Sequence, residues 1–173
     1  MRRKFHMHAE SLKLGRSICI FRSVILFFAL FLQTAFASPQ CRPSTASCAY
    51  YACAEDKLQC GEENYLTQFG AHFCEKYRST EANFSKRGQV WLQKVRYCLQ
   101  KELDRGLDSG VSCSRVEDFA FDSHVGCYVK TGYCSLGFRD KFRVVSVGSK
   151  EVFRGNFFKR IRTFQRVDAA CAR

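Results

Sequence analysis

The sequence predicts an all-α fold: a small, disulfide-rich helical domain with about five helices and five disulfides. Apolar side chains recur at three- and four-residue steps through most of the chain, which is the period of an amphipathic helix. Eleven of the 173 residues are cysteine, and only two are proline. A hydrophobic content of 46% excludes a disordered chain, and the length excludes a large multidomain enzyme.

Residues 1–37 have the features of a secretory signal peptide. Six Lys and Arg side chains precede an apolar run over 23–37, which ends in the small-x-small pattern of a signal-peptidase site, Ala35-Phe36-Ala37. A membrane anchor is the alternative, but this run of about 15 residues is shorter than the roughly 20 that a spanning helix needs. We therefore expect cleavage after Ala37, a secreted, extracellular protein and a mature domain over residues 38–173.

Three segments in the first two thirds of the mature chain are predicted as helices. The first spans 62–77 and carries an aromatic face. The second spans 86–105 and follows Ser85, whose hydroxyl can cap it. The third begins at the capping-box pattern Ser114–Glu117 and ends at about Val129. The face of the first helix comprises Tyr65, Leu66, Phe69, Phe73 and Tyr77.

The last third of the chain is predicted to hold an extended linker and a basic C-terminal helix. Residues 142–147 have the β-branched content of a strand, but a single strand has no partner here, so we interpret them as extended. Ser149 can then cap a final helix over 149–171. We expect the apolar stripe of that helix to pack against neighbouring helices rather than to enter a membrane. The stripe comprises Phe153, Phe157, Ile161, Phe164, Val167 and Cys171.

The positive charge of the mature chain is concentrated at its C-terminal end. Residues 38–134 are neutral, whereas residues 135–173 carry ten Lys and Arg side chains and three acidic ones. Such a basic helix favours a heparin-like polysaccharide, an anionic membrane or an acidic protein as partner, while export makes nucleic acid an unexpected one. A face that is merely solvated is the alternative. The residues predicted to bind a polyanion are Arg154, Lys159, Arg162 and Arg166.

Ten cysteines follow the predicted signal peptide, and this even number predicts five disulfides in an oxidising compartment. No two of them are separated by two residues, which argues against a zinc site. Ten cysteines allow about 945 connectivities, so spacing alone does not select one. They are Cys41, Cys48, Cys53, Cys60, Cys74, Cys98, Cys113, Cys127, Cys134 and Cys171.

The mature sequence contains no recognisable catalytic constellation. His72 and His124 are its histidines, and neither lies in a nucleophile or metal motif. A secreted phospholipase is excluded because its adjacent cysteines, followed by a His-Asp pair, do not occur here. We therefore expect structural or surface roles for both histidines, and we predict no enzyme activity, no cofactor and no metal site.

The cysteine spacing resembles that of the stanniocalcins, a family of secreted, helical, disulfide-rich glycoprotein hormones. Segments 82–84, 88–92 and 127–130 are also similar to that family, and the resemblance covers residues 41–171. The matching steps run from Cys48 to Cys53, Cys74 to Cys98, Cys113 to Cys127 and Cys127 to Cys134, at five, 24, 14 and seven residues.

The resemblance implies a function and a disulfide pairing. It implies hormone-like signalling by protein binding, with an extracellular receptor as partner and calcium and phosphate homeostasis as the role. A secreted inhibitor of an extracellular metalloproteinase is one alternative, and a basic, membrane-active defence protein is another. The implied disulfides join Cys41 to Cys53, Cys48 to Cys74, Cys60 to Cys113, Cys98 to Cys127 and Cys134 to Cys171.

The chain also departs from the family. Its first cysteine step is shorter than the family's, and its fourth is longer. The sequence ends at Arg173, before the cysteine that links two chains in vertebrate stanniocalcins, so we expect no covalent homodimer. Asn83 is the predicted glycosylation site because it lies in an Asn-x-Ser sequon, although the family's usual site lies between its third and fourth cysteines.

Mass spectrometry of the secreted protein checks the redox and processing predictions together. After alkylation without reduction, we expect no alkylated cysteine and an N-terminus at Ser38, because every mature cysteine is predicted to be paired. More than one alkylated thiol would contradict the fully paired cysteines, and an N-terminus upstream of Ser38 would contradict the cleavage site.

Overall fold

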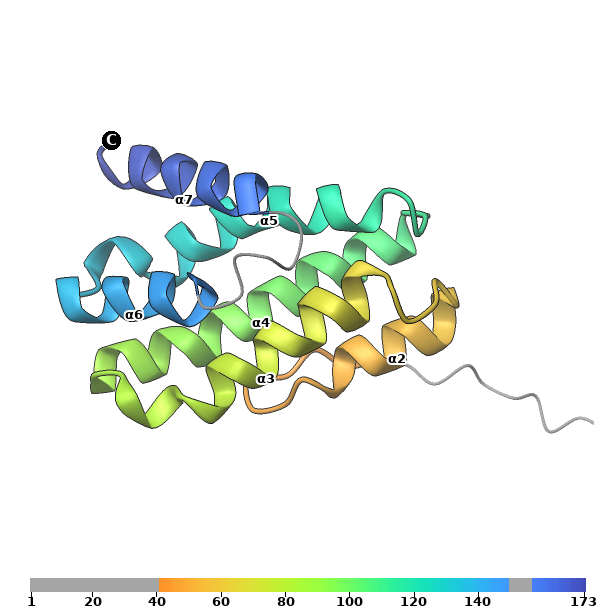
Figure 1. The fold of residues 1–173 in the computed structure, drawn as a ribbon, viewed down its shortest axis with the longest axis horizontal. Helices are drawn as coiled ribbons and strands as arrows, with labels where there is room; N and C mark the ends of the chain where they lie inside the picture. The colour runs from red at the N-terminus through yellow and green to blue at the C-terminus, as the bar shows by residue number, and fades with distance from the viewer. Residues whose placement is uncertain (1–40, 150–156) are drawn as a thin grey trace, which may run out of the picture. The chain divides into compact units, whose positions relative to one another are not determined.

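The domain is all-α, as the sequence predicts (Figure 1). The computed structural model describes residues 41–149 and 157–173, and every regular element among them is helical. The predicted signal peptide, Phe153 and Arg154 lie outside these residues. The elements are α2 (Ala49–Leu58), the π-helical η1 (Leu66–Ala71), α3 (His72–Ser79), η2 (Glu81–Asn83), α4 (Lys86–Asp108), α5 (Val116–Thr131), η3 (Tyr133–Ser135), α6 (Phe138–Ser149) and α7 (Phe157–Cys171).

The long helix α4 and its neighbour α5 organise the domain. α5 packs against both α4 and α7, while α2 and α3 contact α4 (Figure 1). α4 begins as predicted, because Ser85 caps it: the Ser85 hydroxyl accepts a hydrogen bond from the Gly88 amide at 3.1 Å. The helix then extends three residues beyond the predicted end at 105.

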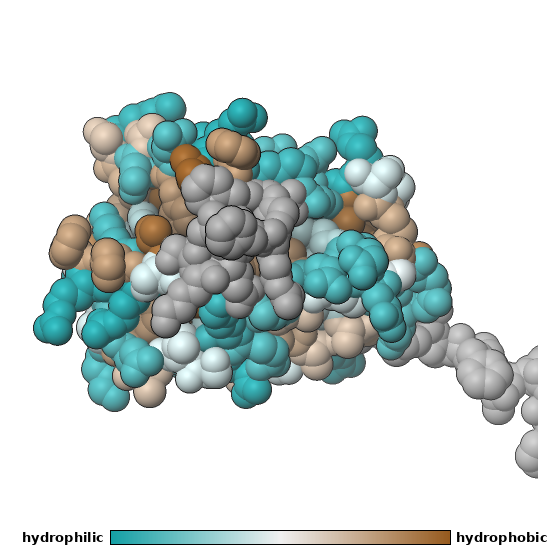
Figure 2. Space-filling model, viewed as in Figure 1, coloured by the Kyte–Doolittle hydropathy of each residue, from teal (hydrophilic) through white to brown (hydrophobic). Residues whose placement is uncertain are grey.

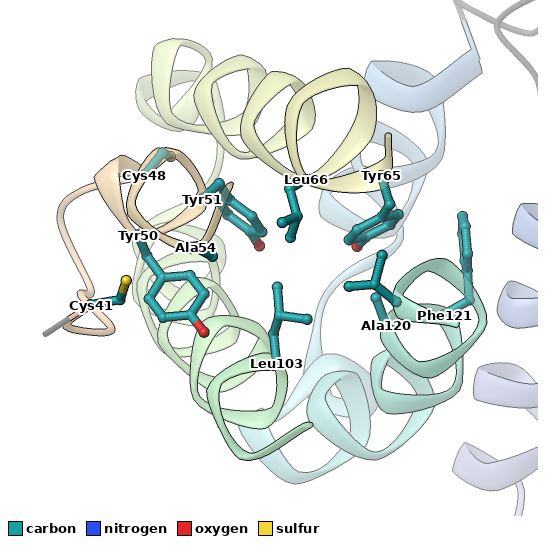
Figure 3. Close-up of a cluster of buried hydrophobic side chains, with 11 residues drawn as sticks. Cys41, Cys48, Tyr50, Tyr51, Ala54, Tyr65, Leu66, Leu103, Ala120 and Phe121 are labelled. Carbon is teal, nitrogen blue, oxygen red and sulfur yellow. The ribbon is translucent and has the colours of Figure 1, made fainter. Parts of the chain in front are cut away.

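Two hydrophobic clusters fill the space between the helices. Figure 3 shows the first, in which Tyr51 and Leu66 point toward Leu103 of α4. The second cluster lies around Trp91 of α4. The buried members of the second cluster are Phe84, Trp91, Leu92, Val95, Cys98, Cys127, Tyr128, Tyr133, Leu136, Val144 and Val167. Since α4 and α5 contribute to both clusters, these two helices connect them.

Five disulfides link the helices and their connections, with Cα atoms 5.3 to 5.9 Å apart. They form the same pairs that the resemblance to the stanniocalcins implies. The first fastens the segment before α2 to that helix, the second joins α2 to α3, and the third joins the loops that follow α2 and precede α5. The fourth joins α4 to α5, and the fifth ties η3 to the end of α7. The pairs are Cys41–Cys53, Cys48–Cys74, Cys60–Cys113, Cys98–Cys127 and Cys134–Cys171.

The prediction of an extended linker over 142–147 is wrong, because these residues lie inside helix α6. Tertiary contacts override their β-branched propensity. Val144 is fully buried in the second cluster, and its carbonyl oxygen accepts a hydrogen bond from the Tyr77 hydroxyl at 2.6 Å. Ser149 is therefore the last residue of α6 and not the cap of the following helix.

Two further helix starts differ from the predictions. The helix predicted over 62–77 begins at η1, after a turn in which the Asn64 side chain accepts a hydrogen bond from the Leu66 amide at 2.6 Å. The predicted capping box at the start of α5 does not form, since the Ser114 hydroxyl is bonded to that of Ser112 at 3.1 Å. Helix α2 was not predicted as a separate element.

Gly106 and Gly126 provide a matched pair of glycines inside helices. A Cβ on Gly106 would lie 2.4 Å from the Phe119 ring, whereas a Cβ on Gly126 would meet nothing within 4 Å. Alanine favours a helix over glycine by about 1 kcal/mol, so Gly126→Ala should raise the free energy of unfolding by roughly that amount. Gly106→Ala should lower it, because the ring must move. Urea titrations of both variants measure this difference, and equal stabilisation would contradict the tight packing at Gly106.

Candidate functional site

The outward side of α6 carries an exposed apolar surface. Phe138, Phe142 and Val145 follow one another at helical steps and are 83%, 63% and 45% exposed. The two phenylalanine rings stack, with centroids 6.4 Å apart. Figure 2 shows apolar side chains on the surface around this helix. Adjacent exposed aromatic side chains of this kind are typical of interaction sites.

Basic side chains border this surface. Arg139 is exposed next to Phe138. The Lys141 ammonium lies 5.3 Å from the centre of the Tyr133 ring, so its methylene stem covers apolar surface while its charge stays near water. We call Phe138, Arg139, Lys141, Phe142 and Val145 the α6 face. Its composition, aromatic rings bordered by cations, favours a partner with an apolar patch and acidic groups.

The opposite side of α6 holds the helix firmly on the domain. Asp140 is only 3% exposed, and its carboxylate accepts hydrogen bonds from the Ser85 amide at 3.0 Å and from the Ser85 hydroxyl at 2.5 Å. Arg143 lies 3.6 Å from the same carboxylate. A buried charge with these partners couples α6 to the start of α4. The α6 face is therefore presented on a fixed helix.

Two of the basic side chains that the sequence analysis assigns to a polyanion site on α7 form ion pairs within the domain. Lys159 forms ion pairs with the carboxylates of Glu117 and Asp118, at N–O distances of 2.5 and 2.6 Å. Arg166 forms an ion pair with Asp122 at 2.8 Å. Arg162 is exposed, and it has no ion pair among the described residues. The acidic side of α5 thus neutralises two of the four predicted polyanion-binding residues. Binding of a heparin-like polysaccharide remains a prediction that rests on the others.

The apolar stripe predicted for α7 is partly wrong. Val167 is buried and Phe164 packs against the second cluster, as expected, but Ile161 is 40% exposed. Thr163 lies inside instead, where its hydroxyl donates to the Lys159 carbonyl at 2.9 Å and so loses no hydrogen bond on burial. Both these contacts and hydrophobicity determine which side of α7 is buried. The sequence alone indicates only the hydrophobicity.

The two histidines have structural surroundings, as expected. Nδ1 of His124 lies 2.6 Å from the Ala120 carbonyl oxygen, and the ring packs between Phe121 and Tyr128. Burial lowers the pKa of His124 despite that hydrogen bond, so the ring is neutral at pH 7. His72 packs edge-on against Phe73.

One group of metal-ligating side chains comes together within the described residues, and it cannot hold an ion as it stands. It comprises Cys98, Glu102 and Cys127. The two sulfurs are bonded to each other as a disulfide. Hydrogen bonds from Lys130 and Arg105 occupy the Glu102 carboxylate and lower its pKa. These residues therefore join α4 to α5 through a disulfide and through the ion pair between Lys130 and Glu102.

The predicted glycosylation site is accessible in the folded domain. Asn83 is exposed at the end of η2, directly before α4. Ser85, the third residue of the sequon, contributes its hydroxyl to the cap of α4 and to Asp140. A glycan on Asn83 would extend from the surface near the start of α4, and its presence remains a prediction.

No model of a known protein family, no curated protein and no solved structure matches this chain. Within residues 41–149 and 157–173, no helix combines the length and the apolar character that crossing a membrane requires. The fold and the arrangement of its side chains therefore carry the functional interpretation.

The ion pair between Lys159 and Asp118 predicts a measurable pKa change. The hydrogen bond from Lys159 lowers the pKa of the Asp118 carboxyl below its usual value near 3.9. Because the pKa is lower in the folded than in the unfolded state, the pair stabilises the fold above about pH 4, and this contribution is lost as the pH falls through the folded-state pKa. Lys159→Met should raise the Asp118 pKa in an NMR titration.

Arg162→Met is the matched control, since it removes a nearby exposed cation that has no ion pair among the described residues. We expect this control to leave the Asp118 pKa almost unchanged, because exposed charges at a distance are screened by salt. An Asp118 pKa that is the same in the Lys159 variant and in the parent would contradict the ion pair.

Proposed function

We propose that this chain is a secreted, stanniocalcin-like protein that acts by binding another extracellular protein. The observation that carries the proposal is the disulfide framework, whose pairs coincide with those that the family resemblance implies. Multiple disulfides are typical of extracellular proteins, because thiols are kept reduced in the cytosol. The signal peptide predicted for residues 1–37 adds independent support for secretion, although it lies outside the described residues.

Binding without chemistry suits the arrangement of the described residues. The histidines are packed structurally, and the one potential metal-ligand group is occupied by a disulfide and by ion pairs. The α6 face offers what recognition needs: two exposed aromatic rings, flanking cations and a rigid support. Rigid aromatic anchors lose little conformational entropy on binding and dominate the affinity of many interfaces.

The partner that we propose is an extracellular receptor, with hormone-like signalling in calcium and phosphate homeostasis as the role that the resemblance implies. In the alternative role, the chain would inhibit an extracellular metalloproteinase by binding it through the same surface. An anionic membrane is a different class of partner, because an aromatic and basic helix face can also lie in a lipid interface. The test must therefore separate protein from lipid.

The test uses the oxidised domain of residues 38–173, fluorescently labelled, on cells of the source organism. We expect saturable binding that unlabelled domain displaces and that protease treatment of the cells removes. Phe142→Asp should weaken binding by about tenfold or more, because it buries a charge in an apolar contact. Val90→Asp is the control, since Val90 is a 49% exposed apolar residue on α4 outside the α6 face.

Three outcomes decide the proposal. Loss of binding in the Phe142 variant alone supports it, provided that both variants keep the melting temperature of the parent. Equal loss in both variants, or no saturable binding, overturns the role of the α6 face. Binding to anionic phospholipid vesicles with leakage of their contents, and no protease-sensitive binding to cells, would instead establish the membrane-active alternative.

A further inference from the structure

An aromatic cavity of about 90 Å³ lies among the helices, and side chains from α2, η1, α3, α4, α5 and α7 form its wall. It is separate from the α6 face and plays no part in the function proposed above. Figure 3 shows the hydroxyl groups of Tyr51 and Tyr65 directed into the space between the helices. Phe73, Trp91 and Tyr128 supply further aromatic wall. Rings, and not aliphatic side chains, thus form most of its surface.

Trp91 brings an unsatisfied hydrogen-bond donor to this cavity. Its side chain is buried, with 3% exposed, and its Nε1 has no hydrogen-bond partner in the described structure. The indole is held edge-on against the Tyr128 ring, with centroids 5.3 Å apart. A buried N–H group without an acceptor is costly, so native structures almost always provide one. Trp91 is part of the cavity wall, so a slight rotation of its ring would bring the N–H to an acceptor bound in the cavity.

Arg160 brings an uncompensated positive charge to the same cavity. Its guanidinium carbon lies 4.9 Å from the centre of the Phe73 ring and 5.9 Å from that of Phe69. Lys159 and Arg166 on the same helix have carboxylate partners, but Arg160 has neither an ion pair nor a hydrogen bond among the described residues. Arg160 is half-buried, so its guanidinium loses part of its hydration, and contact with aromatic faces replaces only some of that loss. The cavity therefore has a cation and an unpaired N–H donor in its wall.

The tyrosine hydroxyls add neutral donors. Burial raises the pKa of Tyr51, Tyr65 and Tyr128, so all three keep their protons at physiological pH. None of these hydroxyls has a hydrogen-bond partner within the part of the chain that the structure describes. His124, which also lines the cavity, is neutral because burial lowers its pKa. The charge balance of the cavity is therefore positive.

We propose that this cavity binds a small organic anion, a carboxylate with a short apolar body. The carboxylate oxygens would accept hydrogen bonds from the Trp91 indole and the Arg160 guanidinium, while the apolar body would contact the aromatic wall. Size limits the ligand, because the cavity of about 90 Å³ is smaller than the roughly 150 Å³ that accommodates benzene in an engineered protein core. Short-chain carboxylates fit this limit.

The chain carries its own reporter for the test, since Trp91 is its single tryptophan. The oxidised mature domain is titrated with butyrate and, separately, with butyramide, which has nearly the same shape and no charge. Both titrations are followed by tryptophan fluorescence and by the melting temperature. We expect butyrate to give a saturable fluorescence change and a higher melting temperature, with an affinity about tenfold above that of butyramide, because a charge-assisted hydrogen bond is lost with the amide.

Two arginine variants on α7 assign the effect to the cavity. Arg160→Gln should reduce the affinity for butyrate to that for butyramide. Arg162→Gln should bind butyrate like the parent, because it removes an exposed charge from the same helix. Circular dichroism and the melting temperature without ligand establish that Arg160→Gln is folded. If it is not, Trp91→Phe replaces it, and loss of the melting-temperature shift with butyrate is then the expected result.

Other outcomes overturn the proposal. Equal affinities for butyrate and butyramide would show that no anion is selected. Equal weakening in both arginine variants would show a general effect of surface charge. No saturable change in either readout up to about 50 mM ligand, a range that still detects very weak binding, would show that the cavity holds only water. The membrane and receptor experiments on the α6 face are independent of all three results.

Discussion

The disulfide between Cys98 and Cys127 fixes α4 against α5, and the rest of the domain depends on this pair of helices. Both sulfurs are buried in the second hydrophobic cluster. α2 and α3 contact α4, and α7 contacts α5. Both clusters use side chains from α4 and α5, so a displacement of one helix along the other would disturb the two clusters together. The other disulfides join the start of α2 to α3, the loop after α2 to the loop before α5, η3 to α7, and the segment before α2 to α2 itself. Each contributes about 2 to 4 kcal/mol by restricting the unfolded chain.

Much of the fold could be predicted from the sequence, because cysteine number and helical periodicity are local signals. The cap of α4 at Ser85 and the extent of α5 to within a few residues follow from such signals. Helix α6 could not be predicted in this way. Its identity depends on Val144 and Asp140 meeting partners on α3 and at the start of α4, which are distant in the sequence.

The candidate site was less accessible to prediction. Charge counting located the basic end of the chain, but it could not show that Lys159 and Arg166 lie on the carboxylates of α5. Nor could periodicity assign Arg160 to the inner side of α7, since a charged residue is expected outside. The exposed side of α6 could not be predicted, because the β-branched content of residues 142–147 favours an extended segment over a helix. The candidate binding surfaces therefore depend on tertiary packing, which local sequence signals do not reveal.

Peptide mapping of the non-reduced protein measures the central feature of this structure directly. Digestion without reduction, followed by mass spectrometry, should yield a peptide containing Cys98 linked to one containing Cys127, and the other four pairs as the structure has them. Finding Cys98 linked to any other cysteine would contradict the central α4–α5 pair and, with it, the disulfide framework on which the proposed function rests.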